Sequence, residues 1–328
     1  MDIPKEMRAA VVTGTGGPDD LHIQTRPVPE LGPGQALIRV AAAGLNYADV
    51  MQSRGLYLGG PKPPYVAGLE ASGEVVAVGK GVQLGPGARV LGGGGGAFAE
   101  YVAWPAAGLS QLPDGWSYGQ GAAFFVQWFT AHGCLRTVGR LKPGEWVLVH
   151  AAAGGVGSAA VRLAKHFGAR VIATASSPEK LERAKALGAD VLIDYERERF
   201  VERTLEATGG VGADLVLEMV GGETFEKNFE ATRPYGRIVV FGSASAKVAK
   251  VDNVSLIFRP VEVIGYHLNV LSRRRPDLFS AEVKEVQALI QQGVVVPEEP
   301  QAYPLDEVAR AYRDLESRKT TGKLAITF

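Results

Sequence analysis

Apolar residues follow two different periods along this chain, and the change of period divides it. Up to about residue 110, short apolar runs between Gly- and Pro-rich turns predict β-strands at residues 7–13, 35–43, 72–78 and 88–103. Apolar positions in residues 120–137 recur instead at helical spacing, and strands then alternate with helices as far as residue 265. This pattern predicts an α/β protein, with a barrel-like β domain followed by a doubly wound parallel sheet.

The alternating region supplies the candidate strands of that sheet. They lie at residues 146–149, 170–174, 191–193, 214–219, 236–241 and 261–265, with helices near 156–167, 200–207 and 225–232. A helix near residues 282–291 and a strand at 323–327 follow, and we expect them to return to the first domain. The expected boundaries are 1–125, completed by about 266–328, for the β domain and 126–265 for the sheet domain.

Small residues fill the turn between the strand at 146–149 and the helix that follows it. Ala152, Gly154 and Gly157 occupy the G-x-G-x-x-G positions, with alanine replacing the first glycine. Gly154 would let the backbone approach a pyrophosphate, and Gly157 would let the helix pack closely on its strand. Backbone N–H groups at the helix start favour phosphate, although a tight turn without a ligand is the alternative. We therefore predict a dinucleotide site with cofactor contacts at Ala153, Gly154, Gly155, Val156 and Gly157.

The end of the second strand indicates which dinucleotide binds. A site for NAD usually has Asp or Glu there to bind the ribose 2′-hydroxyl, whereas this chain has Ala175, Ser176 and Ser177, with Lys180 one helical turn later. Hydroxyls and a lysine suit a 2′-phosphate, which a carboxylate would repel. Since Ser177 also fits an ordinary helix N-cap, Ser176 and Lys180 carry the prediction of NADPH as cofactor.

Composition and charge narrow the possible functions. Lys plus Arg and Asp plus Glu number 35 each, so the net charge does not favour nucleic acid or an anionic membrane as partner. No apolar run approaches a membrane span and the first residues do not form a signal peptide, so a cytoplasmic protein is expected. The single cysteine, Cys134, excludes intramolecular disulfides and multi-cysteine zinc sites, and its apolar neighbours predict a buried, inert thiol.

Five motifs beyond these patterns point to one family. They are Gly44–Asp49 (GLNYAD), Arg54–Tyr57 (RGLY), Gly68–Gly73 (GLEASG), His150–Gly157 (HAAAGGVG) and Tyr235–Val239 (YGRIV). With them the chain resembles the zinc-free quinone oxidoreductases related to zeta-crystallin, in the medium-chain dehydrogenase/reductase superfamily. The resemblance implies a GroES-like β-barrel catalytic domain and a Rossmann domain that binds NADPH. It also implies a homodimer, in which strand 261–265 could extend one sheet into another.

Zinc enzymes of the same superfamily hold their metal where this chain has Asn46, Leu69 and about Val126. None of these side chains is a useful zinc ligand, so we expect no metal. Without a Lewis acid, reduction of an electron-poor acceptor remains feasible, and an NADPH-dependent quinone reductase is the predicted function. Two alternatives stay open: an NADPH-dependent reductase of the double bond in 2-alkenals, enones or enoyl thioesters, and a non-enzymatic crystallin-like NADPH-binding or RNA-binding protein.

The resemblance also assigns roles to single residues. Asn46 would lie beside the nicotinamide and donate to an acceptor oxygen or to the cofactor's carboxamide, although it could simply support a turn. Tyr57 would be a proton donor or an apolar wall, and Gln127, with Phe125, falls where the family's interdomain cleft closes or is plain packing. Further cofactor contacts implied in this way are Tyr195, Phe241, Gly242, Ser243 and Arg318.

Overall fold

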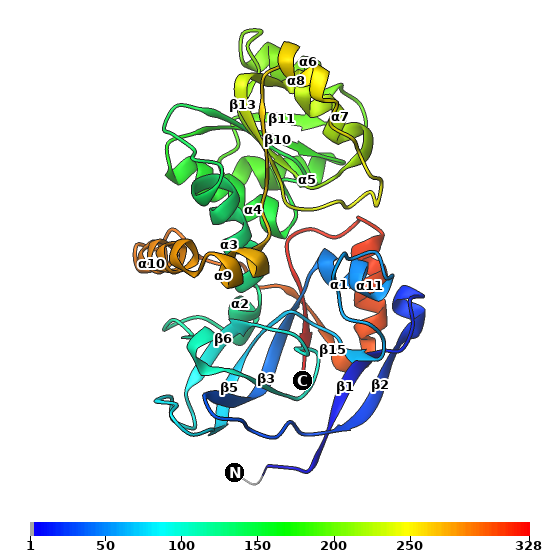
Figure 1. The fold of residues 1–328 in the computed structure, drawn as a ribbon, viewed down its shortest axis with the longest axis vertical. Coiled ribbons are helices and arrows are strands. Elements are labelled where there is room, and N and C mark those ends of the chain that lie inside the picture. Colours follow the sequence, from blue (N-terminus) through cyan, green and yellow to red (C-terminus); the bar gives the residue numbers. More distant parts are fainter. Residues whose placement is uncertain (1–2) are drawn as a thin grey trace. The chain divides into compact units, whose positions relative to one another are not determined.

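The computed structural model describes residues 3–328, apart from the side chain of Ser255, and its ribbon is drawn in Figure 1. The chain forms two compact units. Unit 1 comprises Met1–Val126 and Pro297–Phe328, and unit 2 comprises Gln127–Val296. Unit 1 therefore takes up the chain again near its C-terminus, as the sequence predicts.

Unit 1 is built on two sheets, and its pairing is antiparallel except between β15 and β16. The smaller sheet has the order β2 (Leu21–Pro27), β1 (Glu6–Val12) and β4 (Tyr65–Val66). The larger has the order β15 (Gln301–Pro304), β16 (Leu324–Thr327), β3 (Gln35–Leu45), β5 (Glu70–Val78), β6 (Arg89–Gly93) and β8 (Leu109–Gln111), and β7 (Tyr101–Pro105) also pairs with β3. The predicted β domain is confirmed, and β2 is a strand that we did not predict.

Short helices cover the sheets of unit 1. They are α1 (Tyr47–Ser53), α2 (Tyr118–Ala122) and α11 (Val308–Glu316), with 3-10 turns at Gly17–Asp20, Ala106–Gly108 and Leu305–Glu307. Helix α11 comes from the C-terminal segment and lies beside α1 (Figure 1). Its Tyr312 is fully buried and meets the ring of Phe98 edge-on, at 6.3 Å between centroids. The C-terminal segment thus completes the core of unit 1.

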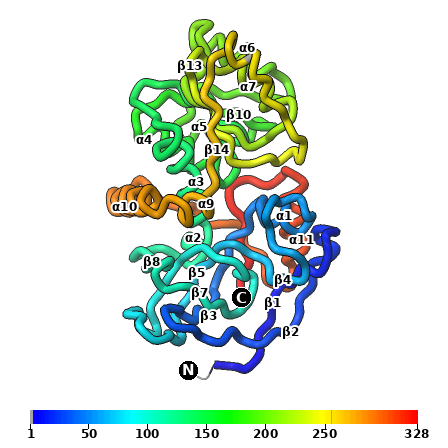
Figure 2. Tube along the Cα trace, in the orientation of Figure 1, coloured from blue at the N-terminus to red at the C-terminus, as the bar shows by residue number. Residues whose placement is uncertain are grey.

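Unit 2 contains the predicted parallel sheet, which is followed most easily along the chain trace of Figure 2. Its strand order is β11 (Val191–Asp194), β10 (Arg170–Ala175), β9 (Trp146–Val149), β12 (Ala213–Glu218), β13 (Thr232–Val240) and β14 (Glu262–Gly265). All pairs are parallel. The order reverses between β9 and β12, the place where doubly wound sheets bind ligands beyond the carboxyl ends of their strands. The helices are α3 (Phe125–His132), α4 (Gly155–His166), α5 (Pro178–Ala186), α6 (Phe200–Ala207), α7 (Gly222–Ala231), α8 (Asn253–Phe258), α9 (Leu268–Arg274) and α10 (Pro276–Gln291).

The helix expected at residues 120–137 is interrupted. Helix α3 ends at His132 and continues as a π-helical turn, Gly133–Thr137. The Tyr266 hydroxyl lies here, 3.2 Å from the Phe129 carbonyl oxygen in the last part of α3. The Val138 N–H bonds the Gly133 carbonyl at 3.0 Å, five residues back, as in a π-helix. A Cβ on Gly133 would lie 2.2 Å from the Tyr266 ring, so only glycine admits this side chain.

The same contacts place residues 266–296 in unit 2, whereas we expected them in the β domain. Glu282 of α10 accepts from Thr137 at 2.8 Å and from the Tyr266 hydroxyl at 3.1 Å. Glu285, one turn later, pairs with Arg136 at 3.3 Å. Helix α10 is therefore fastened to the π-helical turn, and the chain returns to unit 1 only at Pro297.

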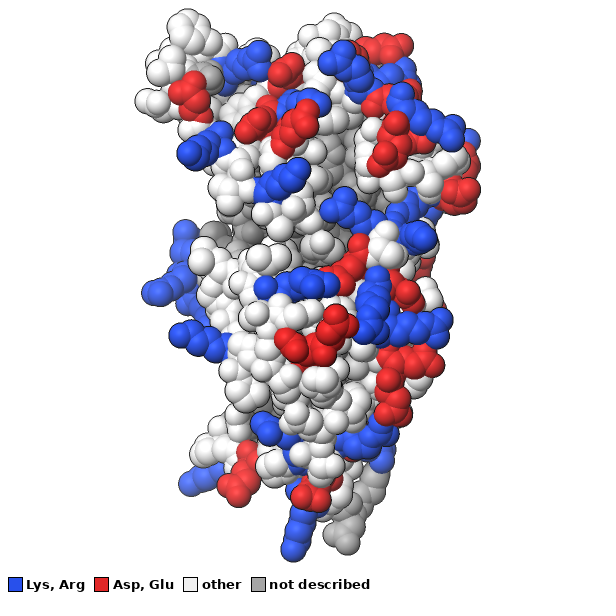
Figure 3. Space-filling model, turned by 90° about the vertical axis from the view of Figure 1, so that its right-hand side faces the viewer, with Lys and Arg blue, Asp and Glu red and all other residues white. Residues whose placement is uncertain are grey.

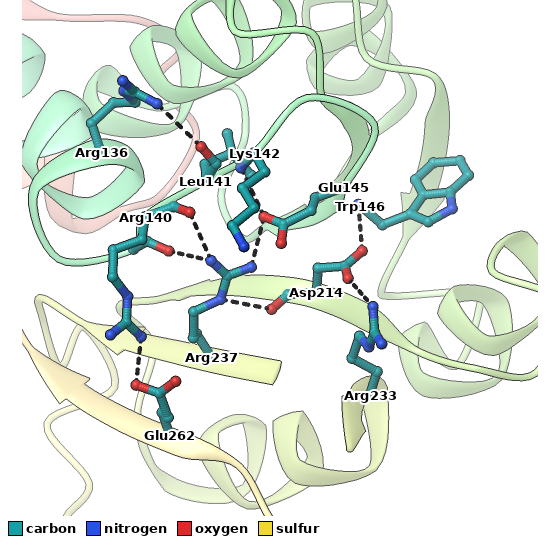
Figure 4. A network of polar contacts seen from close by, with 11 residues as sticks. Arg136, Arg140, Leu141, Lys142, Glu145, Trp146, Asp214, Arg233, Arg237 and Glu262 are labelled. Carbon is teal, nitrogen blue, oxygen red and sulfur yellow. Dashed lines mark hydrogen bonds and ion pairs between the residues drawn. The ribbon is translucent and has the colours of Figure 1, made fainter. Parts of the chain in front are cut away.

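A buried arginine fixes the loop that leads into β9 (Figure 4). Arg237 of β13 donates to the carbonyl oxygens of Gly139 at 2.6 Å and Arg140 at 3.0 Å, and pairs with Glu145 at 2.7 Å. Next to it, Asp214 of β12 accepts from the Trp146 N–H at 2.8 Å. These contacts hold the amino end of β9, and so they set where its carboxyl end meets the glycine turn.

Candidate functional site

The glycine turn has the geometry of a phosphate site. Helix α4 begins after Gly154, and Ala151 takes the left-handed conformation with φ of 49°. A Cβ on Gly157 would lie 2.2 Å from the Ala151 carbonyl oxygen, so the turn itself requires glycine there. A Cβ on Gly154 would lie 3.3 Å from its nearest atom, the Ala151 carbonyl oxygen. Packing within the protein therefore requires glycine at this position less strictly than at Gly157. The first backbone N–H groups of α4 can therefore be approached closely at Gly154.

Gln127 is packed against this turn. Its side chain is only 7% exposed, and a Cβ on Gly155 would lie 2.5 Å from its Oε1 atom. The neighbouring turn residues Ala152 and Ala153 are buried as well. The structure thus brings Gln127 together with Gly155, and a direct role for Gln127 in catalysis stays a prediction.

Behind the turn, a chain of buried polar groups joins three strand ends, and the sequence analysis did not anticipate it. His150 Nδ1 lies 3.1 Å from Thr174 Oγ1, and its Nε2 lies 2.8 Å from Asn228 Oδ1. The Asn228 amide nitrogen in turn donates to Glu218. Since Asn228 offers its oxygen to the ring, Nε2 carries the proton and Nδ1 accepts from Thr174. Burial lowers the pKa of His150, which keeps the imidazole neutral.

Glu218 connects that chain to the loop after β12. Its Oε1 accepts from the backbone N–H groups of Val220 at 2.5 Å and Gly221 at 2.6 Å, and its side chain is fully buried. The Phe241 N–H, just beyond β13, donates to the Glu218 carbonyl at 3.0 Å. A Cβ on the next residue, Gly242, would lie 3.1 Å from Met219, and the side chain of Ser243 lies beside Gly221. Three predicted contact residues, Phe241–Ser243, are therefore at the carboxyl edge of the sheet.

The residues predicted to select NADPH are partly brought together. Lys180 Nζ donates to Ser176 Oγ at 3.3 Å, and Ser177 caps α5 by accepting from the Lys180 N–H at 3.4 Å. Tyr195 follows β11, is 42% exposed, and donates its N–H to the Ala175 carbonyl at 3.1 Å. All four residues belong to unit 2. Arg318 belongs to unit 1, where it has a φ of 59° after α11, and its place in the pocket stays a prediction.

In unit 1, Asn46 belongs to a buried charged cluster with two residues that the sequence analysis did not single out. Its Nδ2 donates to Glu70 Oε1 at 2.9 Å and to the Gly44 carbonyl at 3.2 Å. Lys323 Nζ donates to Asn46 Oδ1 at 2.6 Å and to Glu70 Oε1 at 2.5 Å, and Glu70 Oε2 accepts from the Val126 N–H at 2.9 Å. The sequence does carry a signal for Glu70 and Lys323, because each is a charged residue at the end of an apolar strand. Buried charged side chains are rare unless they are paired.

Asp49 adds a second buried carboxyl beside this cluster. Its Oδ2 accepts from the Asn46 N–H at 2.8 Å, and the side chain is 2% exposed. Burial raises the pKa of Asp49 to about 7, against the lowering effects of the Asn46 N–H and Lys323. Half-buried Tyr57 follows α1, and burial together with the charge of Asp49 raises the pKa of its phenol. Tyr57 therefore keeps its proton at neutral pH, as a proton donor must.

The donor atoms near Asn46 do not fit a catalytic zinc. Asn46 and Glu70 are engaged with an ammonium, and Leu69 and Val126 offer no side-chain donor. Across residues 3–328, no group of three His, Cys, Asp or Glu side chains is arranged to hold a metal ion.

Within the same residues, no helix has the length and apolar character needed to span a membrane. On the face drawn in Figure 3, basic and acidic side chains are interspersed.

Comparisons with known proteins agree with both halves of this description. An alcohol dehydrogenase GroES-like domain model matches residues 32–114, and a zinc-binding dehydrogenase model matches residues 155–288. The rat synaptic vesicle membrane protein VAT-1 homolog is 33% identical over 98% of this chain and 84% of its own length. A quinone oxidoreductase of Pseudomonas aeruginosa is 36% identical over 95% of this chain and 96% of its own.

Two solved structures have the same fold over nearly the whole chain. Escherichia coli quinone oxidoreductase complexed with NADPH superposes with a TM-score of 0.91, at 32% identity, covering 98% of this chain and 100% of the other. The CurK enoyl reductase has a TM-score of 0.89 at 26% identity, covering 99% of each chain.

Proposed function

Because this chain belongs to the quinone oxidoreductase group of the medium-chain dehydrogenase/reductase superfamily, we propose that it transfers reducing equivalents from NADPH to a quinone. The reaction consumes NADPH, a proton and the quinone, and it yields NADP⁺ and the hydroquinone. Bound NADPH would supply the hydride. The protein's part is to hold both reactants, exclude water and deliver the proton.

The observation that carries the proposal is the contact between Lys180 and Ser176 at the end of β10. An ammonium and a hydroxyl lie within 3.3 Å of each other there, and residues 173–177 contain no carboxylate. A 2′-phosphate accepts from both groups, while the ribose hydroxyl of NADH finds no acidic partner. The E. coli relative solved with NADPH supports the same choice of cofactor.

The remaining predicted residues fit successive parts of this task. The backbone of Ala153–Gly157 at the start of α4 would bind the pyrophosphate, and Phe241–Ser243 would contact the nicotinamide end. Tyr57 would give its proton to the reduced acceptor, since its raised pKa keeps the phenol protonated. Asn46 would not donate freely, because both amide hydrogens are already used by Gly44 and Glu70.

A reductase of conjugated double bonds is the second candidate, and the match to an enoyl reductase favours it. The hydride chemistry is the same, but the proton goes to carbon. A positioned acid is then essential, and Tyr57 is the residue that could act as one. A quinol oxygen can instead take its proton from water, so the two candidates differ in their dependence on Tyr57.

The test is NADPH oxidation, followed by absorbance, with a series of quinones and a parallel series of enones and enals. We expect turnover with quinones in wild type and only a modest loss in Tyr57→Phe. Turnover confined to enones, abolished in Tyr57→Phe, would select the second candidate. Absence of NADPH oxidation with every acceptor would refute both and leave a binding protein.

A further inference from the structure

The ammonium of Lys323 is buried in unit 1. Its side chain is 7% exposed and that of Glu70 is 1% exposed. Two of its three N–H groups go to Asn46 Oδ1 and Glu70 Oε1, at 2.6 and 2.5 Å. A buried ion pair of this kind contributes little net stability, because desolvation offsets the attraction. Its position around Asn46 therefore calls for another explanation.

The contacts leave the Asn46 amide one possible orientation. Lys323 can only donate, so it must face the amide oxygen. The Glu70 carboxylate can only accept, so it must face the amide nitrogen, which also donates to the Gly44 carbonyl. Turning the amide over would set nitrogen against ammonium and oxygen against carboxylate. Asn46 is also the N-cap residue of α1.

The cluster joins segments that are distant in the sequence. Asn46 stands between β3 and α1, Glu70 opens β5, and Lys323 directly precedes β16. The N–H of Val126, the last residue of the N-terminal segment of unit 1, completes it by donating to Glu70 Oε2. The amide plane of Asn46 is thus set by the strands of the larger sheet.

We propose that Lys323 is a positioning residue for the reductase reaction, which fixes the Asn46 amide through its oxygen and forms an oriented ion pair with Glu70 beside it. The proposal rests on the proposed function and on the place beside the nicotinamide that the family resemblance gives to Asn46. Glu70 balances the charge of Lys323, but the ammonium lies on the oxygen side of the amide and the carboxylate on its nitrogen side. The pair therefore forms an oriented dipole, which would stabilise charge that develops beside Asn46 as the acceptor is reduced. Lys323 thereby acts on Asn46, which stands at one of the positions where the resemblance places a metal ligand in zinc enzymes.

The test compares Lys323→Met with the double variant Lys323→Met/Glu70→Gln. In the single variant we expect kcat to fall about 10- to 100-fold, the effect of losing one charge-assisted hydrogen bond, with the Kd for NADPH nearly unchanged. The single variant also leaves Glu70 as an uncompensated buried charge, so its thermal midpoint should fall. The double variant removes both charges and should regain thermal stability while kcat stays low.

Recovery of kcat to within about threefold of wild type in the double variant would overturn the proposal, because Lys323 would then matter only as the partner of Glu70. Arg39→Met is the matched control, since it removes the ion pair of Arg39 with Glu74 at 2.9 Å from the same two strands without touching Asn46. Its kcat should equal that of wild type.

A separate measurement keeps this inference distinct from the proposed function. If wild type fails to oxidise NADPH whichever acceptor is supplied, the proposed function fails. The side-chain amide resonances of Asn46 then still test the positioning. They should shift and broaden in Lys323→Met and in the double variant, and stay unchanged in Arg39→Met. Identical resonances in all four proteins would refute the role of Lys323.

Discussion

Lys180 Nζ lies 3.3 Å from Ser176 Oγ, so the two side chains chosen from sequence for the 2′-phosphate meet at the end of β10. One charge-assisted hydrogen bond is worth about 1.5–3 kcal/mol. We therefore predict that Lys180→Ala raises the Michaelis constant for NADPH by roughly ten- to a hundredfold and leaves that for NADH nearly unchanged. Steady-state kinetics with both cofactors measure this directly, and an equal effect on both would show that the pocket lies elsewhere.

Ser176→Asp tests the same pocket in the opposite direction. The new carboxylate should repel the 2′-phosphate and offer the ribose of NADH an acceptor, so the preference for NADPH should narrow or reverse. Glu179→Gln is a suitable control, because that carboxylate is exposed on the first turn of α5. A variant Ser176→Asp that keeps the wild-type preference would contradict the assignment.

The two glycines of the turn should serve different purposes: Gly157 is needed for folding, and Gly154 is needed for binding NADPH. Gly157→Ala places a Cβ 2.2 Å from the Ala151 carbonyl oxygen, and such overpacking should destabilise the fold by about 1–3 kcal/mol or more. Gly154→Ala meets its nearest atom at 3.3 Å and should destabilise the fold much less than Gly157→Ala, but bind NADPH more weakly. Urea unfolding and NADPH titration of the two variants should give opposite patterns. Equal NADPH affinity in Gly154→Ala and wild type would argue against a pyrophosphate at this turn.

Asp49 should make the protein less stable as the pH rises through neutrality. Its pKa is about 7 in the folded protein against 3.8 for the ordinary side chain, so the folded state holds a proton that the unfolded state releases. The resulting stability is complete below pH 3.8 and is lost as the pH rises through about 7, to a total of roughly 4 kcal/mol. Lys323 and Glu70 face this carboxyl, and the phenols of Tyr57, Tyr65 and Tyr312 feel its charge.

Asp49→Asn isolates that contribution. The amide oxygen can still accept from the Asn46 N–H but carries no titrating proton. Thermal midpoints between pH 5 and 9, measured by calorimetry, should fall more steeply in wild type than in the variant. Asp306→Asn removes an exposed carboxylate paired with Arg8 and should keep the wild-type slope. Parallel slopes for wild type and Asp49→Asn would refute the shift.

The oligomeric state should depend on β14, which is an edge strand of the parallel sheet. Among the described strands, it pairs with β13 alone. Apolar side chains are exposed around it, notably Val263 on the strand and Ile257 and Phe258 on α8. We predict a homodimer in which two copies of β14 pair edge to edge, and Val263→Lys should yield monomers in light scattering at micromolar concentration. Val211→Lys changes another exposed valine of unit 2, away from β14, and should stay dimeric. A monomeric wild type would refute the prediction.

The elements that sequence patterns predicted best are those whose local composition decides their structure. Buried parallel strands read as apolar runs, so β9 and β12 were placed within a residue, and α6 was placed with both ends correct. The π-helical turn was missed because nothing in residues 120–137 shows that Tyr266, far along the chain, packs against Gly133. For the same reason the boundary at 266 was set too early, since nothing local shows that α10 is fastened to this turn.

The candidate site divides in the same way. The glycine turn and the pair Ser176 and Lys180 follow from spacing along a single βαβα segment, so sequence alone could find them. Glu70 and Lys323 are 253 positions apart, and only the folded sheet brings them together. His150 stands in a quoted motif, but its partner Asn228 belongs to a helix whose inward face the sequence did not specify.

The chain from Thr174 through His150 and Asn228 to Glu218 has a consequence for how this protein can diverge. Each member fixes the donor or acceptor role of the next, so a single replacement leaves a neighbour with a partner of the wrong kind. Asn228→Asp, for example, would set one carboxylate against another in the interior. Variation at these positions should therefore be strongly epistatic, with compensating pairs accepted where either change alone is rejected. A library randomised at all four positions together should recover folded combinations that no stepwise path through single substitutions reaches.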